Sequence, residues 1–236
     1  MGDKTNENKN NENIVKKEKV ENKNKEEKVK KSKAREILEW IICIVIAFAL
    51  ALFIKFYIFT PTLVLQESMT PTILNGERVL INRLVRTFNL DLERGDIVTF
   101  EAPSVNEMAN GDITATYYDV DGLMNSFLYY VMESGKTSYI KRVIGLPGDK
   151  VEIMGGNVYI NDEKIEEDYL PESTKTYIPD GGVPKSFTVP EGYIFAMGDN
   201  RAGSSDCRAF GCVPIERVEG KVSLRIWPLN KFGGVD

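Results

Sequence analysis

The stretch from Tyr139 to Ile160, YIKRVIGLPGDKVEIMGGNVYI, decides the fold class of this chain. It contains three short runs rich in β-branched residues: Tyr139–Ile144, Lys150–Ile153 and Asn157–Ile160. Pro147-Gly148-Asp149 separates the first two runs, and Gly155-Gly156 separates the last two as in a tight hairpin. Short strand-forming runs divided by turn residues predict antiparallel β-structure.

The same pattern continues through most of residues 60–236. Further runs of this kind are Arg78–Ile81, Asp96–Phe100, Tyr193–Met197 and Lys221–Ile226. We therefore expect a mainly β domain, built as small antiparallel sheets or a partly open barrel. Residues 101–138 fit the pattern poorly, so we expect an insertion there between two core strands.

Upstream of this domain lies an apolar run. Trp40–Ile54 has no charge, and after Lys55 the apolar residues continue to Phe59. About 20 such residues cross roughly 30 Å of hydrocarbon as a helix, so we predict a transmembrane helix over residues 36–59. Lys55 lies near one end, where its ammonium reaches the headgroups, and Pro61 follows as a helix stop.

Residues 1–35 are rich in Lys, Asn and Glu, and we predict a disordered basic tail. Basic residues cluster directly before the apolar run, which favours a single-pass protein of the cell membrane with a cytoplasmic N-terminus and an extracytoplasmic β-domain. A cleaved signal peptide is the competing interpretation, with Ala47-Phe48-Ala49 as a small-x-small site. That site lies inside the apolar run, so an uncleaved anchor is favoured.

Composition excludes several kinds of active site. The chain has no histidine, so a Ser-His-Asp triad, a Cys-His dyad and a His-ligated zinc site cannot form within it. Its three cysteines are too few for a four-cysteine zinc site. The formal net charge of -5 argues against nucleic acid as a partner. A hydrolase of this composition needs another base, such as lysine.

Ser68 and Lys141 are the candidate nucleophile and base. Lys141 interrupts an otherwise apolar strand, and strand alternation directs it and Arg142 to opposite faces. A lysine with a pKa of about 10.4 is almost wholly protonated at pH 7, and burial against apolar side chains lowers that pKa. Taken singly, a serine beside a proline is usually a turn residue and a lone strand lysine usually faces solvent.

Four motifs, in this order along the chain, favour the catalytic interpretation of Ser68 and Lys141 over these ordinary roles. They are Gln66-Glu67-Ser68-Met69-Thr70-Pro71-Thr72-Ile73, Arg94-Gly95-Asp96-Ile97-Val98-Thr99-Phe100, the stretch Tyr139–Asp149, and Gly198–Gly211 (GDNRAGSSDCRAFG). Together with the preceding anchor, they resemble the conserved boxes of the type I signal peptidases, across residues 36 to about 230. The resemblance implies a membrane-bound serine endopeptidase that removes signal peptides from exported preproteins at A-x-A-like sites, beside the lipid bilayer and without a metal or other cofactor.

The resemblance also implies roles for individual residues. Ser68 would be the nucleophile, Lys141 the general base, and Ser204 would orient the lysine amine. Asp199 would pair with Arg142, and Asp206 with Arg208. The Ser68 backbone N–H would donate one oxyanion hydrogen bond. Shallow apolar substrate pockets would be lined by Val64, Leu65, Met69, Ile73, Tyr139 and Ile140.

Two positions depart from the family pattern. Gln66 stands where serine or glycine is usual, and its amide could supply a second oxyanion donor or narrow the pocket. Cys207 stands where serine is usual, and with Cys212 it could form a disulfide or remain a free thiol. Other functions stay open: a different Ser-Lys peptidase, such as a relative of self-cleaving repressors; a catalytically silent anchored β-domain that binds exported proteins; or a secreted binding protein.

Overall fold

A computed structural model describes residues 33, 35–105, 112–118, 122, 125, 129 and 135–235. Nearly all of the predicted disordered tail, residues 1–35, lies outside the described residues, and so does much of the predicted insertion. The disorder of that tail therefore stays a prediction. The chain forms two units, residues 1–53 and residues 54–236, which are considered separately.

The N-terminal helix runs from Arg35 to Tyr57, and its length and composition suffice to cross a membrane. It ends two residues before the predicted boundary because Phe59 already belongs to the first strand. Leucine, isoleucine, phenylalanine and alanine make up most of its surface, and these side chains are largely exposed. A solvent-exposed apolar surface of this kind is typical of a helix that lies in lipid.

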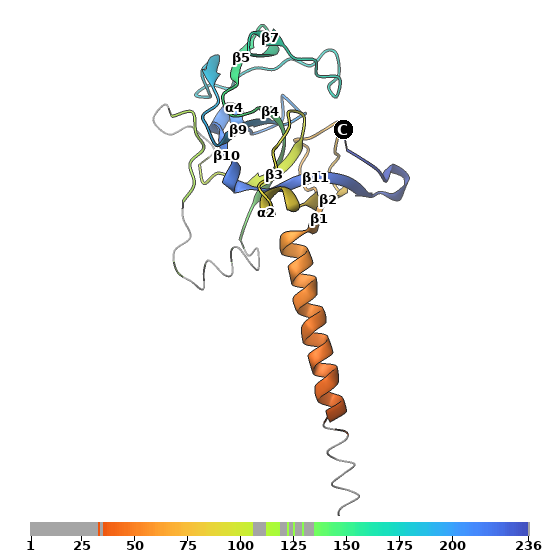
Figure 1. The fold of residues 1–236 in the computed structure, drawn as a ribbon. Coiled ribbons are helices and arrows are strands. Elements are labelled where there is room, and N and C mark those ends of the chain that lie inside the picture. The colour runs from red at the N-terminus through yellow and green to blue at the C-terminus, as the bar shows by residue number, and fades with distance from the viewer. Residues whose placement is uncertain are drawn as a thin grey trace, which may run out of the picture. The chain divides into compact units, whose positions relative to one another are not determined.

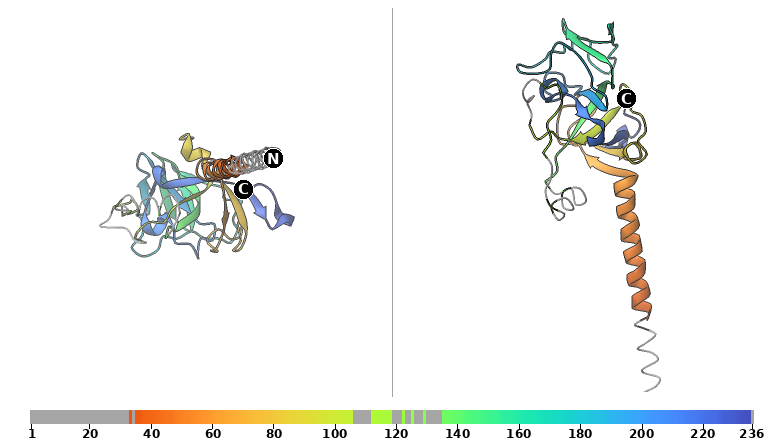
Figure 2. Two further views of the ribbon diagram at one scale, coloured as in Figure 1. Left: turned by 90° about the horizontal axis from the view of Figure 1, so that it is seen from below. Right: turned by 60° about the vertical axis from the view of Figure 1, so that its left-hand side comes forward.

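Seven strands form the larger sheet of the second unit (Figure 1). In sheet order they are β1 (Phe59–Leu63), β2 (Arg78–Asn82), β11 (Val218–Trp227), β3 (Ile97–Glu101), β4 (Ser138–Gly145), β9 (Tyr193–Met197) and β10 (Val213–Pro214). Every pairing is antiparallel, and bulges interrupt the registers of β11 with β2 and β3 and of β4 with β9. Such bulges increase twist, and the sheet curls in the views of Figure 2.

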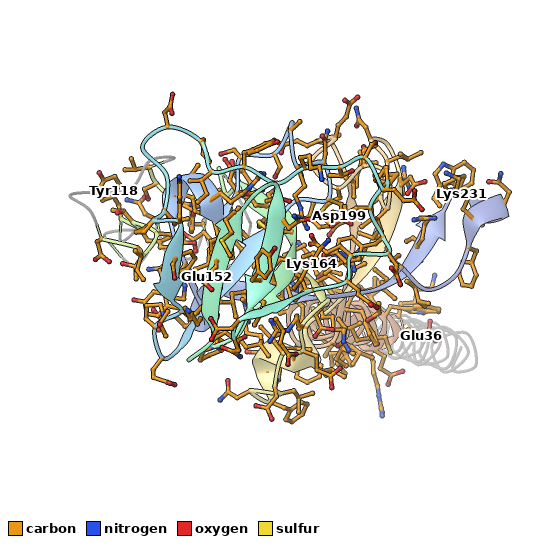
Figure 3. The ribbon with its side chains drawn as sticks, turned by 90° about the horizontal axis from the view of Figure 1, so that it is seen from above. Glu36, Tyr118, Glu152, Lys164, Asp199 and Lys231 are labelled. Carbon is orange, nitrogen blue, oxygen red and sulfur yellow. The ribbon has the colours of Figure 1, made fainter. Side chains whose placement is uncertain are left out.

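A second, four-stranded sheet has the order β7 (Glu163–Lys164), β6 (Asn157–Ile160), β5 (Lys150–Met154) and β8 (Ser186–Thr188). The hairpin between β5 and β6 turns through Gly155 and Gly156, which both have positive φ. Glycine is the residue that accepts this backbone at both turn positions, so the predicted tight hairpin is confirmed. Glu152 and Lys164 of this sheet are labelled in Figure 3.

Short helices complete the fold: α2 (Leu84–Thr87), α4 (Cys207–Phe210), η1 (Ile215–Arg217) and η2 (Leu229–Lys231). Residues 102–137 connect β3 and β4, which pair directly, so this segment leaves and re-enters the sheet between neighbouring strands. Its described part contacts the β10 end through an isolated bridge between Thr114 and Cys212.

The two faces of β4 contact two different apolar clusters. Val98 and Phe100 pair with Lys141 and Tyr139 and belong to the larger cluster. Ile97 pairs with Arg142 and belongs to the smaller one. The predicted alternation is therefore present, and it places Lys141 and Arg142 on opposite sides of a buried strand.

The expected mainly β, antiparallel architecture is confirmed, and each predicted strand is present: β6 and β9 have the predicted ends, and the ends of the others differ by one to three residues. Four strands were not predicted: β1, β7, β8 and β10. β1 contains Pro61, which the sequence suggested only as a helix stop. β1 lies at the edge of its sheet, where a missing N–H is tolerated. The other three are two or three residues long.

Candidate active site

Ser68 and Lys141 lie in direct contact. A hydrogen bond of 2.9 Å joins Lys141 Nζ and Ser68 Oγ, although the residues are 73 positions apart. Lys141 Nζ also donates to the Ile140 carbonyl at 3.0 Å. Ser68 is 5% exposed and Lys141 only 1%. Strand β4 therefore holds an amine against a hydroxyl in a site that water barely enters.

Burial changes the acidity of the lysine. The pKa of Lys141 is lowered from 10.5 to about 8, and desolvation by burial is the largest cause; the Arg208 guanidinium also lowers it, while the carboxylates of Asp206 and Asp199 oppose the shift. The Tyr139 ring centroid lies 5.0 Å from Nζ. Lys141 is thus a base that loses its proton near physiological pH, which an exposed lysine does not do.

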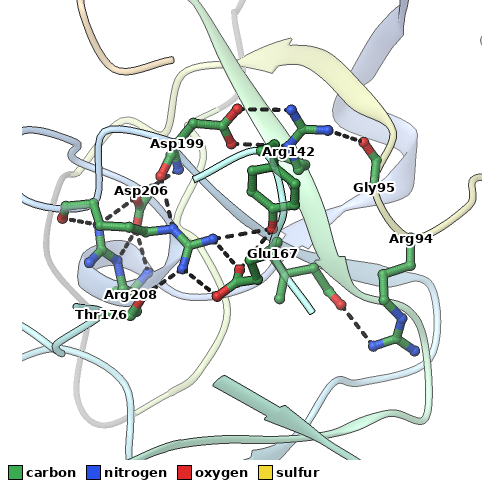
Figure 4. Close-up of polar contacts among 12 residues, drawn as sticks. Arg94, Gly95, Arg142, Glu167, Thr176, Asp199, Asp206 and Arg208 are labelled. Carbon is green, nitrogen blue, oxygen red and sulfur yellow. Dashed lines mark hydrogen bonds and ion pairs between the residues drawn. The ribbon is translucent and has the colours of Figure 1, made fainter. Parts of the chain in front are cut away.

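The two expected ion pairs are both present. Arg142 donates to both carboxylate oxygens of Asp199, at 3.0 and 2.9 Å, and both side chains are almost wholly buried. Arg208 donates to both oxygens of Asp206, at 2.8 Å each. Figure 4 shows the two pairs near one another. Because each is buried and bidentate, they fix the backbone on which they stand more firmly than exposed pairs would.

The loop after β9 connects these pairs to the nucleophile. Asn200 N donates to the Ser68 carbonyl at 3.0 Å, and Asn200 Nδ2 donates to the Glu67 carbonyl at 3.2 Å. Thr72 Oγ1 donates to Asp199 Oδ2 at 2.5 Å. A Cβ atom on Gly198 would overlap the Ser68 carbonyl oxygen and Ser204 Oγ, so only glycine permits this close approach.

Thr72, Gly198 and Asn200 were present in the sequence motifs but had no assigned role. The signal that could have revealed Gly198 is a glycine directly at the end of a buried strand, which often marks a close backbone approach. No comparable signal existed for Thr72 or Asn200, because their partners are set by chain folding.

Ser204 differs from the expectation. Its Oγ is buried, but among the described residues it has no hydrogen-bond partner, whereas Lys141 Nζ bonds to Ser68 and to the Ile140 carbonyl. The expected orienting contact between Ser204 and the lysine amine is therefore not made in this structure.

A groove of about 310 Å³ lies between two chain segments, residues 62–66 and 136–140. Val64, Leu65, Tyr139 and Ile140 line it, as expected, together with the exposed Gln66. Met69 and Ile73 do not: both are fully buried in the smaller apolar cluster, beside Val79 and Ile81. Apolar side chains near a nucleophile can face either the core or the substrate, and sequence alone did not separate these cases.

A larger cavity, of about 760 Å³, lies beside α2, β9 and β10. Val85, Leu90, Leu146, Tyr193 and Ile215 are among its lining residues, and neither Ser68 nor Lys141 lines it. Ser68 and Lys141 are not lining residues of the smaller groove either, but its lining includes Gln66, two residues before Ser68, and Ile140, which directly precedes Lys141. We therefore assign the site to the smaller groove.

Cys207 and Cys212 are free thiols, and both are fully buried. Burial raises the pKa of the Cys207 thiol well above its ordinary value, so it stays protonated at neutral pH. The disulfide left open by the sequence is not formed in this structure.

Comparison with known proteins gives a consistent set of relatives. A model of the family described as signal peptidase, peptidase S26, matches residues 37–227. Signal peptidase IB of Staphylococcus aureus is 36% identical over 211 residues, covering 84% of this chain and 93% of the relative. Signal peptidase I P of Bacillus subtilis subsp. natto is 34% identical over 205 residues, covering 85% and 94%. A crystal structure of a signal peptidase I from Enterococcus faecalis has 28% sequence identity and a TM-score of 0.37, covering 56% of this chain and 97% of that chain.

Proposed function

The chain belongs to the peptidase S26 family of signal peptidases, and on that premise we propose that it is a membrane-anchored serine endopeptidase that removes signal peptides from exported preproteins. Ser68 is the nucleophile and Lys141 the general base. The observation that carries this assignment is the 2.9 Å hydrogen bond between Lys141 Nζ and Ser68 Oγ, made by a lysine that is 1% exposed.

The reaction is an acyl transfer. Neutral Lys141 Nζ takes the Ser68 proton while Oγ attacks the scissile carbonyl carbon, and the carbonyl oxygen becomes an oxyanion. The Ser68 backbone N–H donates to this oxyanion, and the Gln66 amide is the candidate second donor.

Collapse of this intermediate breaks the C–N bond. The Lys141 ammonium protonates the leaving amine, which is the new N-terminus of the mature protein. Water then gives a proton to Lys141 as its oxygen attacks the ester carbonyl carbon between the signal peptide and Ser68. When the ester C–O bond breaks, Lys141 returns this proton to Ser68 Oγ, and the signal peptide leaves with a free carboxyl group. Each step uses residues of the chain and water alone, so the proposal requires no cofactor.

The groove between residues 62–66 and 136–140 receives the substrate. Its walls lead to Ser68 on one side and to Lys141 on the other, so an extended peptide seated there presents its scissile bond to both. A groove of about 310 Å³ with apolar walls suits small side chains, such as those of an A-x-A site, better than bulky or charged ones.

Membrane placement follows from the N-terminal helix, Arg35–Tyr57. We assign its N-terminal end to the cytoplasm because Lys28, Lys30, Lys31, Lys33 and Arg35 precede or begin it, whereas Arg78 is the first basic residue after Lys55. In this orientation the β-domain and the preprotein cleavage site lie on the same, extracytoplasmic side.

The test is cleavage of a purified preprotein by the full chain in detergent micelles. Ser68→Ala and Lys141→Ala should each abolish cleavage, since either change removes one half of the proposed dyad. Lys141→Arg should be equally inactive because a guanidinium stays protonated. Ser173→Ala and Lys185→Ala, at exposed positions, are the matched controls and should retain wild-type rates.

Cleavage that persists in Ser68→Ala or Lys141→Ala would overturn the dyad. A wild-type chain that binds the preprotein without cutting it would instead favour the catalytically silent anchored domain. Replacing the small residues of the A-x-A site by arginine should prevent cleavage by the wild type, and unchanged cutting would contradict the assigned groove.

A further inference from the structure

One segment of the smaller sheet contacts the region behind the dyad. After β7, residues 165–176 run past Arg201, and three of their side chains contact its guanidinium. Glu167 forms an ion pair with Arg201, Thr176 Oγ1 accepts from Arg201 Nη1 at 2.5 Å, and Tyr169 Oη accepts from Nη2 at 3.3 Å. Tyr169 Oη also donates to Glu167 at 2.7 Å. We call Glu167, Tyr169 and Thr176 the clasp.

Arg201 is held by the clasp with almost no access to water. Its side chain is 1% exposed, and that of Glu167 is 14% exposed. A buried guanidinium that loses its carboxylate partner is strongly destabilised, so Arg201 depends on Glu167 for its position. Figure 4 shows Glu167 and Thr176 converging from this segment, close to the Asp206–Arg208 pair.

From the clasp, hydrogen bonds continue to the loop that contacts the nucleophile. Arg201 Nε donates to the Gly198 carbonyl at 3.2 Å, and Arg208 Nη2 donates to the Arg201 carbonyl at 2.8 Å. Within the same loop, Asn200 donates to the carbonyls of Ser68 and Glu67. One short loop, Gly198–Arg201, therefore joins the clasp on one side and the turn carrying Ser68 on the other.

The clasp also contacts the strand that carries the base. The Arg142 guanidinium carbon lies 3.9 Å from the centroid of the Tyr169 ring, a stacking contact. Arg142 directly follows Lys141 in β4 and pairs with Asp199 of the same loop. Tyr169 thus touches both Arg142, the partner of Asp199, and Arg201, two residues after Asp199 in the loop.

We propose that Glu167 and Tyr169 are positioning residues for the hydrolytic reaction: by holding Arg201 and Arg142, they keep the Gly198–Arg201 loop, and through it Ser68, in the geometry of attack. The inference rests on the proposed function. Neither residue lines the groove of residues 62–66 and 136–140, so substrate binding does not depend on them.

The experiment compares Glu167→Gln and Tyr169→Phe in the full chain with matched changes at exposed neighbours, Glu166→Gln and Tyr177→Phe. Tyr169→Phe removes only a hydroxyl, keeps the ring over Arg142 and leaves the Glu167–Arg201 pair in place, so it folds even if Glu167→Gln does not. We expect kcat to fall about tenfold in both clasp variants with KM unchanged, since remote groups act on the alignment of reacting atoms.

Two further readouts separate positioning from general stability. Hydrogen exchange at the amide of Asn200, which donates to Ser68, should accelerate in the clasp variants and stay unchanged in the controls. The midpoint of the pH–rate profile should stay at its wild-type value, because burial of Lys141 is the main cause of its lowered pKa, and Asp206, Arg208 and Asp199 are the charged groups that act on it most strongly after burial.

Three results would overturn the inference: wild-type kcat in both clasp variants, equal losses in the control variants, or a displaced pH midpoint. A failure of the proposed function is recognised separately, as wild-type cleavage that does not depend on Ser68. In that case hydrogen exchange at the Asn200 amide still tests whether the clasp holds the Gly198–Arg201 loop in place. Unchanged exchange in both clasp variants would show that it does not.

Discussion

The proposed base makes a quantitative prediction about the pH dependence of cleavage. Burial lowers the pKa of Lys141 from 10.5 to about 8, and only the neutral amine can take the Ser68 proton. At pH 7 about one molecule in eleven then has a neutral lysine, and at pH 9 about ten in eleven. The value of kcat/KM should therefore rise about tenfold between these pH values, with its midpoint near pH 8.

The assay measures kcat/KM from pH 6 to 10 with a peptide that spans an A-x-A cleavage site. The full chain is kept in detergent micelles at constant ionic strength, and the rate of Ser68→Ala is subtracted at each pH. Burial raises the pKa of the Cys207 thiol well above its ordinary value, so this thiol stays protonated at neutral pH. Intrinsic fluorescence at each pH confirms that the domain stays folded.

Three results would refute this reasoning. A kcat/KM that still rises tenfold per pH unit up to pH 10, without a plateau, would mean that the lysine keeps the acidity of an exposed amine and is not desolvated. A rate that does not change with pH, or a Lys141→Arg variant that still cleaves along the same pH profile, would mean that another group removes the Ser68 proton.

Two further predictions concern stability and backbone packing. Lys141→Met should raise the free energy of unfolding by up to about 3 kcal/mol at pH 7, because a pKa lowered from 10.5 to about 8 measures the cost of burying the ammonium. Between these two pKa values the folded wild type binds fewer protons than the unfolded chain, so its free energy of unfolding rises with pH. The difference in free energy of unfolding between Lys141→Met and the wild type should therefore shrink as pH rises and vanish above about pH 10.5. Denaturant titrations that give the same difference at pH 7 and at pH 10.5 would contradict this prediction. Gly198→Ala should lower kcat at least about tenfold, because the added methyl group displaces Ser68. The control Gly234→Ala should leave kcat unchanged, because its added methyl group meets no neighbour. Equal cleavage rates of the two variants would refute the close approach of Gly198 to the Ser68 carbonyl.

The strands that could be predicted from sequence are those with a long β-branched run and a clear turn at each end. The β5–β6 hairpin is the plainest example, because Gly155-Gly156 defines its turn locally. β1 was missed because Pro61 is a poor strand residue in general and is acceptable only at a sheet edge. Whether a strand lies at an edge depends on the order of all seven strands, which no local pattern contains.

Within the site, the alternation of β4 predicted that Lys141 and Arg142 leave opposite faces. The spacing could not predict which apolar neighbours of Ser68 meet substrate. Met69 and Ile73 are fully buried in one cluster with Val79, Ile81 and Val222, whereas Leu65 is exposed on the groove; Val64 belongs to the same buried cluster and also lines the groove. The difference depends in part on Val222 of β11, which lies far along the chain and joins this cluster only in the folded protein.

The amino-acid sequence alone determined the chemistry available to this protein. Without histidine, a serine hydrolase needs another base, and the ordered motifs around Ser68 and Lys141 supply the candidates. Only the tertiary structure decided that these two side chains meet at 2.9 Å, that Lys141 loses its water, and that Glu167 and Tyr169 reach the arginines behind them. The physical reason is that residue type and spacing are local properties, whereas desolvation and hydrogen bonding across 73 residues exist only once the sheets have closed around the site.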